Sequence, residues 1–235
     1  MGALYPSPNG AYSIFALVTT VPPAQREIEL LKEPDKTILS TLHISDASDA
    51  DIAWSPDSHY VGISALNVYT EHSQVFRVSP AGLTPSGLPA ASYLNIQEPE
   101  TTSAPSVAWS PDARHVAIAA ALQDGQGMIV ASLTSAGFRL VKTPSLEIQK
   151  FMTDKTIPRN ARLYSQSVTP ITWESTDSLL CNLTAQAQLL AANSESNHVF
   201  PTEAYLSINR QVRLQFVKNG DITVSAIGKP QLDEH

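Results

Sequence analysis

The sequence is poor in charged residues, and neither sign of charge dominates strongly. Only 16% of its 235 residues are charged, against a usual share of about 25%. Its 15 basic residues are outnumbered by 22 acidic ones, which gives a net charge of −7 at pH 7 and a pI near 5.3. These values predict no broad basic surface, so we expect neither nucleic acid nor an anionic membrane as a partner.

Cysteine and long apolar runs are also scarce. Cys181 is the single cysteine, so an intrachain disulfide and a thiolate metal cluster are both excluded. The longest mainly apolar run, Tyr12 to Val18, is far shorter than the roughly 18–20 residues that cross a bilayer, and we expect no membrane insertion. No secretory leader is visible at the N-terminus. We expect a cytoplasmic protein if Met1 is the native start, and a periplasmic or envelope protein if a leader was removed.

Proline exceeds glycine, at 17 residues against 10, and serine and threonine together number 44. Average proteins contain more glycine than proline. Hydroxyl side chains are typical of turns and sheet faces, whereas exposed helices carry mainly Glu and Lys. The composition therefore favours strands and turns, and the length suits one large domain or two small ones.

An internal repeat is the strongest feature of the sequence. The segment IAWSPDSHYVGISA (Ile52 to Ala65) aligns without a gap on VAWSPDARHVAIAA (Val107 to Ala120), and eight of the fourteen positions are identical. Weaker copies surround this pair at Leu4 to Val18, Ile171 to Leu183 and Tyr205 to Val217. Repeats of this kind indicate that one supersecondary unit is used several times.

Each copy makes physical sense as a β-hairpin. A short apolar strand ends at the tryptophan, and Ser-Pro-Asp then provides a type I turn, with proline at its first central position. An alternating strand follows, with Val61 and Ile63 on one side and Gly62 and Ser64 on the other. Further strand candidates come after each hairpin, so the second full copy reads as four short strands.

The WSPD units at Trp54 and Trp109 resemble the repeats of TolB-type β-propellers, which are WD-like units also found in the propeller domains of prolyl oligopeptidase relatives. The resemblance implies an all-β propeller with antiparallel blades. Two features depart from the family pattern: Ser58 and Ala113 replace the usual glycine after the aspartate, and the fourth unit has Ser175-Thr176 in place of Pro-Asp. The outer units are therefore expected to be less regular.

Five candidate units would give about 47 residues each, which is close to the roughly 40–50 residues of known blade repeats. We predict a single propeller domain over residues 1–235, with about five small blades in a ring that is closed, irregular or incomplete. Long insertions are expected at about 79–106 and 145–167. A short helix is the expected form of Ser145 to Ile157.

The residues that recur in the repeat are predicted to be structural. Recurrence at one repeat position indicates that the tryptophans fill the space between blades, in preference to forming an aromatic ligand cage. The aspartates stand 55 residues apart in equivalent turns, which favours turn roles over a shared acid–base site. The structural set is Trp54, Pro56, Asp57, Trp109, Pro111, Asp112 and Trp173.

Signals for chemistry are weak. The sequence has no Gly-x-Ser-x-Gly nucleophile elbow and no glycine-rich phosphate loop, so we expect no catalytic residues and no cofactor. The acidic run from Asp46 to Asp51 could attract calcium but lacks the glycine and terminal glutamate of an EF-hand, and a solvated acidic connection is the preferred reading. The six histidines show no ligand spacing, and no metal site is predicted.

The function that we predict is binding without catalysis. Propellers present the loops between blades on a rigid frame, and the expected partner is another protein or a peptide. The candidate binding residues follow the second strand of each strong unit or precede the first: Asp49, Asp51, Glu71, His72, Gln123 and Asp124. Two alternatives remain open, namely the propeller portion of a peptidase-like or carbohydrate-active enzyme, and a TolB-like envelope protein.

Overall fold

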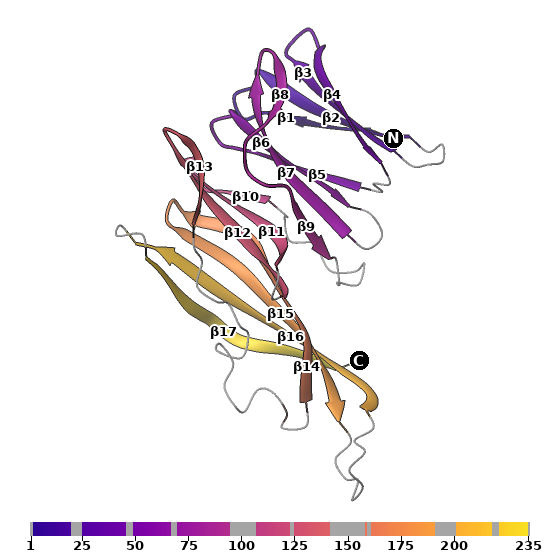
Figure 1. The fold of residues 1–235 in the computed structure, drawn as a ribbon, viewed down its shortest axis with the longest axis vertical. Helices are drawn as coiled ribbons and strands as arrows, with labels where there is room; N and C mark the ends of the chain where they lie inside the picture. Colours follow the sequence, from indigo (N-terminus) through magenta and orange to yellow (C-terminus); the bar gives the residue numbers. More distant parts are fainter. Residues whose placement is uncertain are drawn as a thin grey trace, which may run out of the picture.

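The fold consists of β-strands arranged in four antiparallel sheets (Figure 1). The computed structural model describes residues 2–19, 25–45, 49–66, 70–94, 107–122, 125–141, 158, 161–190, 201–217 and 221–234. Within these ranges the strands follow one another in chain order and the chain forms no helix. The predicted all-β class is therefore confirmed.

We call the four sheets blades 1 to 4. Blade 1 contains β1 (Gly2–Pro6), β2 (Tyr12–Thr19), β3 (Gln25–Lys32) and β4 (Thr37–Ser45). Blade 2 contains β5 (Asp49–Trp54), β6 (Tyr60–Leu66), β7 (Thr70–Ser79), β8 (Gly82–Pro85) and β9 (Ala91–Leu94). Blade 3 contains β10 (Val107–Trp109), β11 (His115–Leu122), β12 (Gly125–Thr134) and β13 (Gly137–Val141). Blade 4 contains β14 (Ala161–Ser175), β15 (Ser178–Leu190), β16 (Pro201–Phe216) and β17 (Ile222–Glu234).

The described residues form four blades, whereas the repeat arithmetic predicted five. The fifth candidate unit, Tyr205 to Val217, is not a hairpin of its own, because nearly all of it lies within β16 as the third strand of blade 4. Strands of 13 to 16 residues in this blade account for the difference. These long strands contain the residues that the repeat arithmetic assigned to a fourth and a fifth blade.

The expected insertion at about 79–106 supplies the outer strands of blade 2. Both β8 and β9 pair with β7, β8 at its C-terminal half and β9 at its N-terminal half. Between them the chain leaves the sheet and places Leu88 in the core that blade 2 shares with blade 3. The second expected insertion, 145–167, ends inside β14, which begins at Ala161. The helix expected at Ser145 to Ile157 lies outside the described residues.

Three apolar cores join the four blades in series. Blades 1 and 2 share a cluster around Ile14, Leu30 and Val61. Blades 2 and 3 share a second cluster around Val75 and Val116, and blades 3 and 4 share a third. Within the described ranges, no cluster joins blade 4 to blade 1. The blades therefore form an open stack from the N-terminal to the C-terminal sheet, as Figure 1 shows.

The middle blades are covered on both faces, which explains their apolar strands. In β11, Val116 and Ile118 belong to the core with blade 2, while Ala117, between them, belongs to the core with blade 4. A strand buried on both sides reads as a continuous apolar run. This burial also explains the low charge content, because only part of each middle blade faces water.

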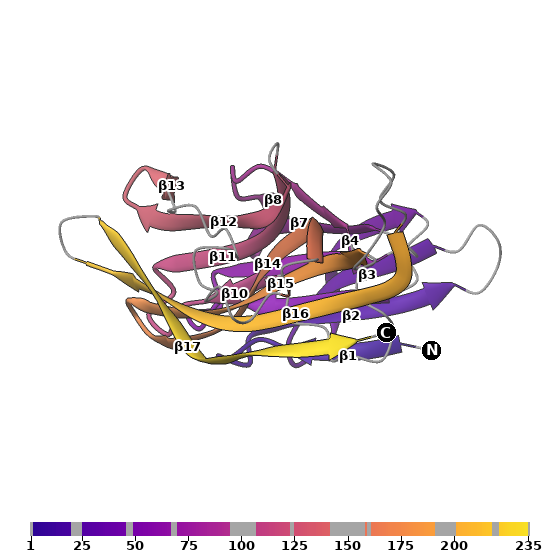
Figure 2. The same cartoon turned by 90° about the horizontal axis from the view of Figure 1, so that it is seen from below.

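The two ends of each blade differ in their connections. Successive strands are antiparallel, so the first-to-second and third-to-fourth connections lie at one end, which we call the turn end. It contains the turns at 7–11, 33–36, 55–59, 80–81, 110–114, 135–136 and 176–177. The opposite end, the loop end, contains the connections between the second and third strands and those between blades. Both chain termini lie toward the loop end (Figure 2).

Candidate functional site

A tryptophan ties each blade to the preceding one. The indole Nε1–H groups donate to backbone carbonyls at one equivalent repeat position: Trp54 to Tyr5 (3.1 Å), Trp109 to Ala53 (3.0 Å) and Trp173 to Ala108 (3.1 Å). A partly buried indole loses its water and needs such an acceptor. The three tryptophans therefore act as fasteners between blades. Pro6 occupies the equivalent position in blade 1.

A ring from the preceding blade stacks on the indole. Tyr60 of blade 2 lies 6.0 Å from Trp109, measured between ring centroids, and His115 of blade 3 lies 5.4 Å from Trp173. Phe216 stacks on the other two rings at the second of these contacts, 5.5 Å from His115 and 5.2 Å from Trp173. Hydrogen bonding and stacking therefore act together at the interface between blades 2 and 3 and at that between blades 3 and 4.

The Ser-Pro-Asp turns are closed by their own side chains. In blade 2 the Ser55 hydroxyl donates to Asp57 Oδ1 (2.6 Å) and accepts from the Tyr60 backbone N–H (2.9 Å). Asp57 Oδ1 also accepts from the His59 N–H (3.1 Å). Equivalent hydroxyl-to-side-chain bonds occur at Ser7–Asn9, Ser110–Asp112 and Ser175–Asp177. The structure thus places Asp57 and Asp112 within separate turns, with no shared acid–base geometry.

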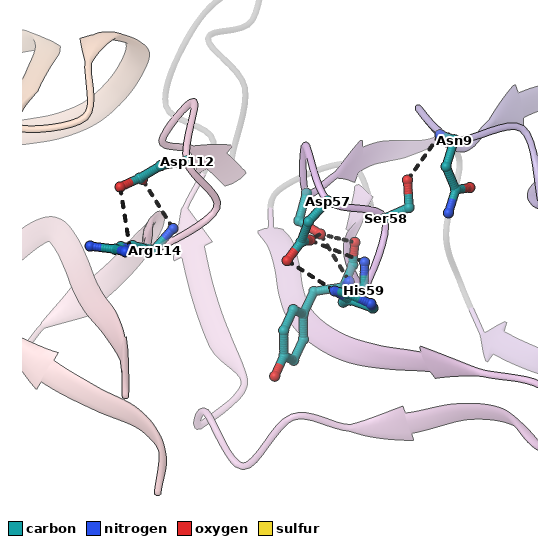
Figure 3. A network of polar contacts seen from close by, with 8 residues as sticks. Asn9, Asp57, Ser58, His59, Asp112 and Arg114 are labelled. Atoms are coloured by element: carbon teal, nitrogen blue, oxygen red, sulfur yellow. Dashed lines mark hydrogen bonds and ion pairs between the residues drawn. The ribbon is translucent and has the colours of Figure 1, made fainter. Parts of the chain in front are cut away.

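The residue after the aspartate adopts a left-handed backbone. Ser58 and Ala113 have φ values of 61° and 59°, close to the 69° of Gly10 at the equivalent position of blade 1. Such a conformation costs an L-residue roughly 1–2 kcal/mol. In blade 2 the Ser58 hydroxyl offsets part of this cost, because it accepts a hydrogen bond from the Asn9 N–H across the blade interface (3.1 Å, Figure 3).

Two basic side chains, His59 and Arg114, project from the turn end beside these aspartates (Figure 3). His59 Nδ1 lies 3.1 Å from Asp57 Oδ2, and Arg114 Nε lies 3.7 Å from Asp112 Oδ2. The side chains of His59 and Arg114 are 72% and 76% exposed, so these ion pairs contribute little to stability. Partial burial opposes ionisation of Asp57, but the bonds from Ser55 and His59 outweigh it and lower the pKa of the carboxyl.

The predicted binding residues converge partly at the loop end of blade 2. The strand register places Asp49 opposite Leu66 and Leu66 opposite Glu71, so the two acidic residues share one row of the sheet. Asp51 is exposed in the next row on that face, opposite Ser64. The Ser64 and Ser73 hydroxyls, both buried, lie 2.7 Å apart in that row.

The remaining predicted residues are distributed differently. His72 is exposed and pairs with Ala65 and Ser92, so it lies in the row between those of Glu71 and Ser73. Gln123 and Asp124 lie outside the described residues, as do residues 67–69.

No metal centre emerges from the part of the chain that is described. In those ranges no three His, Cys, Asp or Glu side chains are grouped in a way that could hold an ion. Asp46, which begins the acidic run, is not among the described residues. The described residues also include no helix long and apolar enough to span a membrane.

The single cysteine is deeply buried between blades 3 and 4. The Cys181 thiol lies 3.9 Å from the Met128 sulfur of blade 3. Burial raises its pKa to about 12. The reactive thiolate is therefore almost absent at neutral pH, and Cys181 serves as packing in this fold.

Sequence reasoning did not identify the outer face of blade 1, which carries Leu4, Phe15 and Leu17 beside Glu27 and Glu29. The signal was available in the residue pattern of β2, whose positions are apolar on both faces over Ile14 to Leu17. That pattern is typical of a strand covered on both sides.

Comparison with known proteins places the chain by its architecture alone. No protein-family model and no curated protein matches it. The fold itself, antiparallel blades of four or five strands stacked in series with a tryptophan at each interface, is that of a β-propeller-type protein.

Several solved structures are similar to the chain. TolB from Acinetobacter baumannii is 8% identical, with a TM-score of 0.37 over 97% of this chain and 55% of that one. The β-propeller domain of the Trilobed protease from Pyrococcus furiosus is 11% identical, with a TM-score of 0.41 over 100% of this chain and 82% of that one. Prolyl oligopeptidase B from Galerina marginata is 11% identical, with a TM-score of 0.42 over 96% of this chain and 34% of that one. The chain thus spans about half of that TolB and a third of that oligopeptidase.

Proposed function

We propose that this protein is a non-catalytic scaffold that binds another protein or a peptide. Two properties of the structure support the proposal. The three tryptophan fasteners hold the blades in a fixed arrangement, and rigid elements position a binding site better than mobile ones do. The open stack also leaves the loop end of each blade available on that frame.

The observation that carries the proposal is the grouping at the loop end of blade 2. The register brings Asp49, Asp51 and Glu71 into adjacent rows of one face. The buried Ser64–Ser73 hydrogen bond joins β6 and β7 in the row of Asp51. Adjacent acidic residues on an ordered sheet favour a partner that presents basic or amide groups.

The first experiment is affinity purification of the intact protein, with bound proteins identified by mass spectrometry. Reproducible protein partners are the expected result. A monomer that binds only a sugar or another small molecule would contradict the scaffold proposal.

The second experiment tests the binding face with the partner so identified. Replacing Asp49, Asp51, Glu71 and His72 together with alanine should weaken partner binding by about tenfold or more, because several charge contacts are lost at once. A matched variant at the turn end, His59→Ala with Arg114→Ala, should bind normally. Equal binding by wild type and a folded loop-end variant would show that the proposed face is wrong. The same comparison with Gln123→Ala and Asp124→Ala extends the test to blade 3.

A further inference from the structure

The outward faces of the first and last blades differ in chemistry. Three cores join four blades, so one face of blade 1 and one face of blade 4 are covered by no other blade within the described residues. In a stack of repeats, a terminal unit needs a polar outer face to remain soluble. Blade 4 meets this requirement more fully than blade 1 does.

From Cys181 to Gln188, β15 of blade 4 alternates between core and polar side chains. Along β15 the core side carries Leu179, Cys181, Leu183, Ala185 and Ala187, all buried. The outward side carries Asn182, Thr184, Gln186 and Gln188. These polar groups bond one another, as the Thr184 hydroxyl accepts from Asn182 Nδ2 (3.2 Å) and donates to Asn209 Oδ1 (2.9 Å).

The charged groups on blade 4 are also matched. Arg213 donates to both carboxylate oxygens of Glu174, at 2.5 Å and 3.0 Å. This bidentate pair lowers the pKa of Glu174 and raises that of Arg213. The outer face of blade 4 is thus mainly polar, although Leu180 and Tyr205 also lie on it.

The outer face of blade 1 carries apolar side chains instead. The register places Leu4 and Phe15 in one row, with Leu17 in the next. Leu4 is 48% exposed, and Ile38 on β4 is 53% exposed. Phe15 lies across β1, since a Cβ on Gly2 would sit 2.5 Å from its ring. Exposed apolar groups gathered on one sheet face mark an interaction surface more often than isolated ones do.

The residue pattern of blade 1 is that of a covered blade. β2 is apolar on both faces over Ile14 to Leu17, as β11 of the doubly buried blade 3 is over Val116 to Ala120. The pattern of β15, which has a polar residue at every second position from Asn182 to Gln188, is absent from β2. The sequence of blade 1 is therefore suited to contact with a partner on its outer face.

Two carboxylates identify the charge of that partner. Glu29 lies in the row of Leu4 and Phe15, and Glu27 lies in the row of Leu17. Both are half-buried, and neither forms an ion pair with any residue in the described ranges. Bringing an apolar surface against them requires positive charge at their positions, because an uncompensated carboxylate is costly to bury.

A second copy of this chain does not satisfy that requirement. Two outer faces of blade 1 in a symmetric pair would bring glutamates toward glutamates, which is repulsive. Docking on the outer face of blade 4 would bury its amide and hydroxyl groups against leucine and phenylalanine, which leaves them without water. Neither arrangement of two copies suits this face, and its charges favour a partner of different sequence.

We propose that the outer face of blade 1 binds an amphipathic, basic helical segment of a partner protein, an inference that rests on the proposed scaffold function. Glu27 and Glu29 are two residues apart on one strand, a rise of about 6.8 Å. Lysines at positions i and i+4 of a helix are separated along its axis by about 6 Å, which matches this spacing. The apolar stripe of such a helix lies over β1 and β2, with its lysines facing β3.

The test uses a defined probe and the intact protein. A fluorescent Leu/Lys peptide with an apolar stripe flanked by lysines at i, i+4 is titrated with the protein and followed by anisotropy. An acidic Leu/Glu peptide of the same pattern serves as the control probe. Saturable binding of the basic peptide alone, with NMR shift changes confined to β1 to β4, is the expected result.

Matched variants separate this face from general attraction to an acidic protein. Glu27→Gln with Glu29→Gln should weaken binding of the Leu/Lys peptide by about tenfold. Thr223→Lys with Ser225→Lys on β17 changes the net charge equally and should have little effect on binding. Leu4→Asn should also weaken binding. An Asp51→Ala variant should bind the peptide normally, so failure of the loop-end site and failure of this site are distinguishable.

Three results would overturn the inference. The first is equal binding of the basic and acidic peptides. The second is unchanged binding by the folded Glu27→Gln, Glu29→Gln variant. The third is a dimer in sedimentation analysis that Leu4→Asn dissociates, because a second copy would then occupy the face.

Discussion

At the scale of single residues, the third residue after the aspartate of each Ser-Pro-Asp turn carries a ring, which is a tyrosine in blade 2 and a histidine in blade 3. Tyr60 in blade 2 and His115 in blade 3 occupy the same repeat position and stack on the tryptophan of the next blade. His115 also lies 2.8 Å from the Ser132 hydroxyl through Nδ1. The histidine adds a titratable group to a contact that is otherwise purely apolar.

Replacing His115 with tyrosine should remove a pH dependence from the stability of the fold. Burial lowers the pKa of His115, assisted by the charge of Arg114 and opposed by Asp112 and Asp177. The unfolded state therefore binds a proton that the folded state resists, so His115 costs stability as pH falls below about 6.5. Denaturant unfolding at pH 5 and pH 8 should show a larger difference for wild type than for His115→Tyr. An equal difference in the two proteins would contradict the assignment.

At the scale of elements, the contact between β6 and β10 depends on a glycine, which has no side chain to occupy the space between the strands. Gly62 lies where blade 3 approaches blade 2 most closely, and a Cβ there would sit 2.6 Å from Val107 Cγ1 and 2.9 Å from its Cβ. The equivalent residue in blade 3 is Ala117, which is fully buried in the next core. A methyl group is thus accommodated at this repeat position in blade 3, whereas in blade 2 it would clash with Val107.

Substituting Gly62 with alanine should push these two strands apart. Overpacking a tight core costs roughly 1–3 kcal/mol in the free energy of unfolding, measured by urea titration. Val107→Ala should be less damaging in the Gly62→Ala background than alone, because it removes two of the clashing carbons. Additive effects of the two substitutions would show that Gly62 and Val107 do not compete for the same space.

The sequence predicts the elements better than it predicts their grouping. The WSPD copies identify the hairpins β5–β6 and β10–β11, since the turn chemistry is local. The outer strands β8 and β9 lie in a stretch containing Pro80, Pro85 and Pro89, which reads as a loop, although edge strands tolerate proline. Four blades form in the described residues where about five were expected, because β14 to β17 are long and use the residues of two repeat lengths.

The candidate sites were harder to predict for a related reason. Asp49 and Glu71 are 22 residues apart in sequence, and only the register of β5, β6 and β7 brings them into one row. Whether a face of blade 1 is covered depends on how the blades stack in space. A repeat in the sequence does not specify that stacking order.

At the scale of the whole molecule, each blade contacts only its neighbours. The core between blades 1 and 2 is separate from the core between blades 3 and 4. In such a linear array, loss of one interface can open one end while the other remains folded. Cys181 reports on the interface between blades 3 and 4, because its thiol is buried there.

Thiol labelling should therefore resolve which interface opens. Native Cys181 should react with Ellman's reagent far more slowly than the unfolded chain at pH 8, since its pKa is raised to about 12. Trp173→Phe, which removes the bond to Ala108, should accelerate labelling, whereas Trp54→Phe at the distant interface should not. Equal acceleration by both variants would show that the stack opens as one unit.

The tryptophan fasteners also bear on how such a chain can evolve. Each indole donates to a main-chain carbonyl at the same repeat position, which a tyrosine (Tyr5) provides in one blade and an alanine (Ala53, Ala108) in the other two. A backbone acceptor is present whatever the side chain, so the donor places no demand on the identity of its neighbour. Duplication of one unit copies both the tryptophan donor and the backbone acceptor. The copies can then diverge in sequence and still form the hydrogen bond between blades.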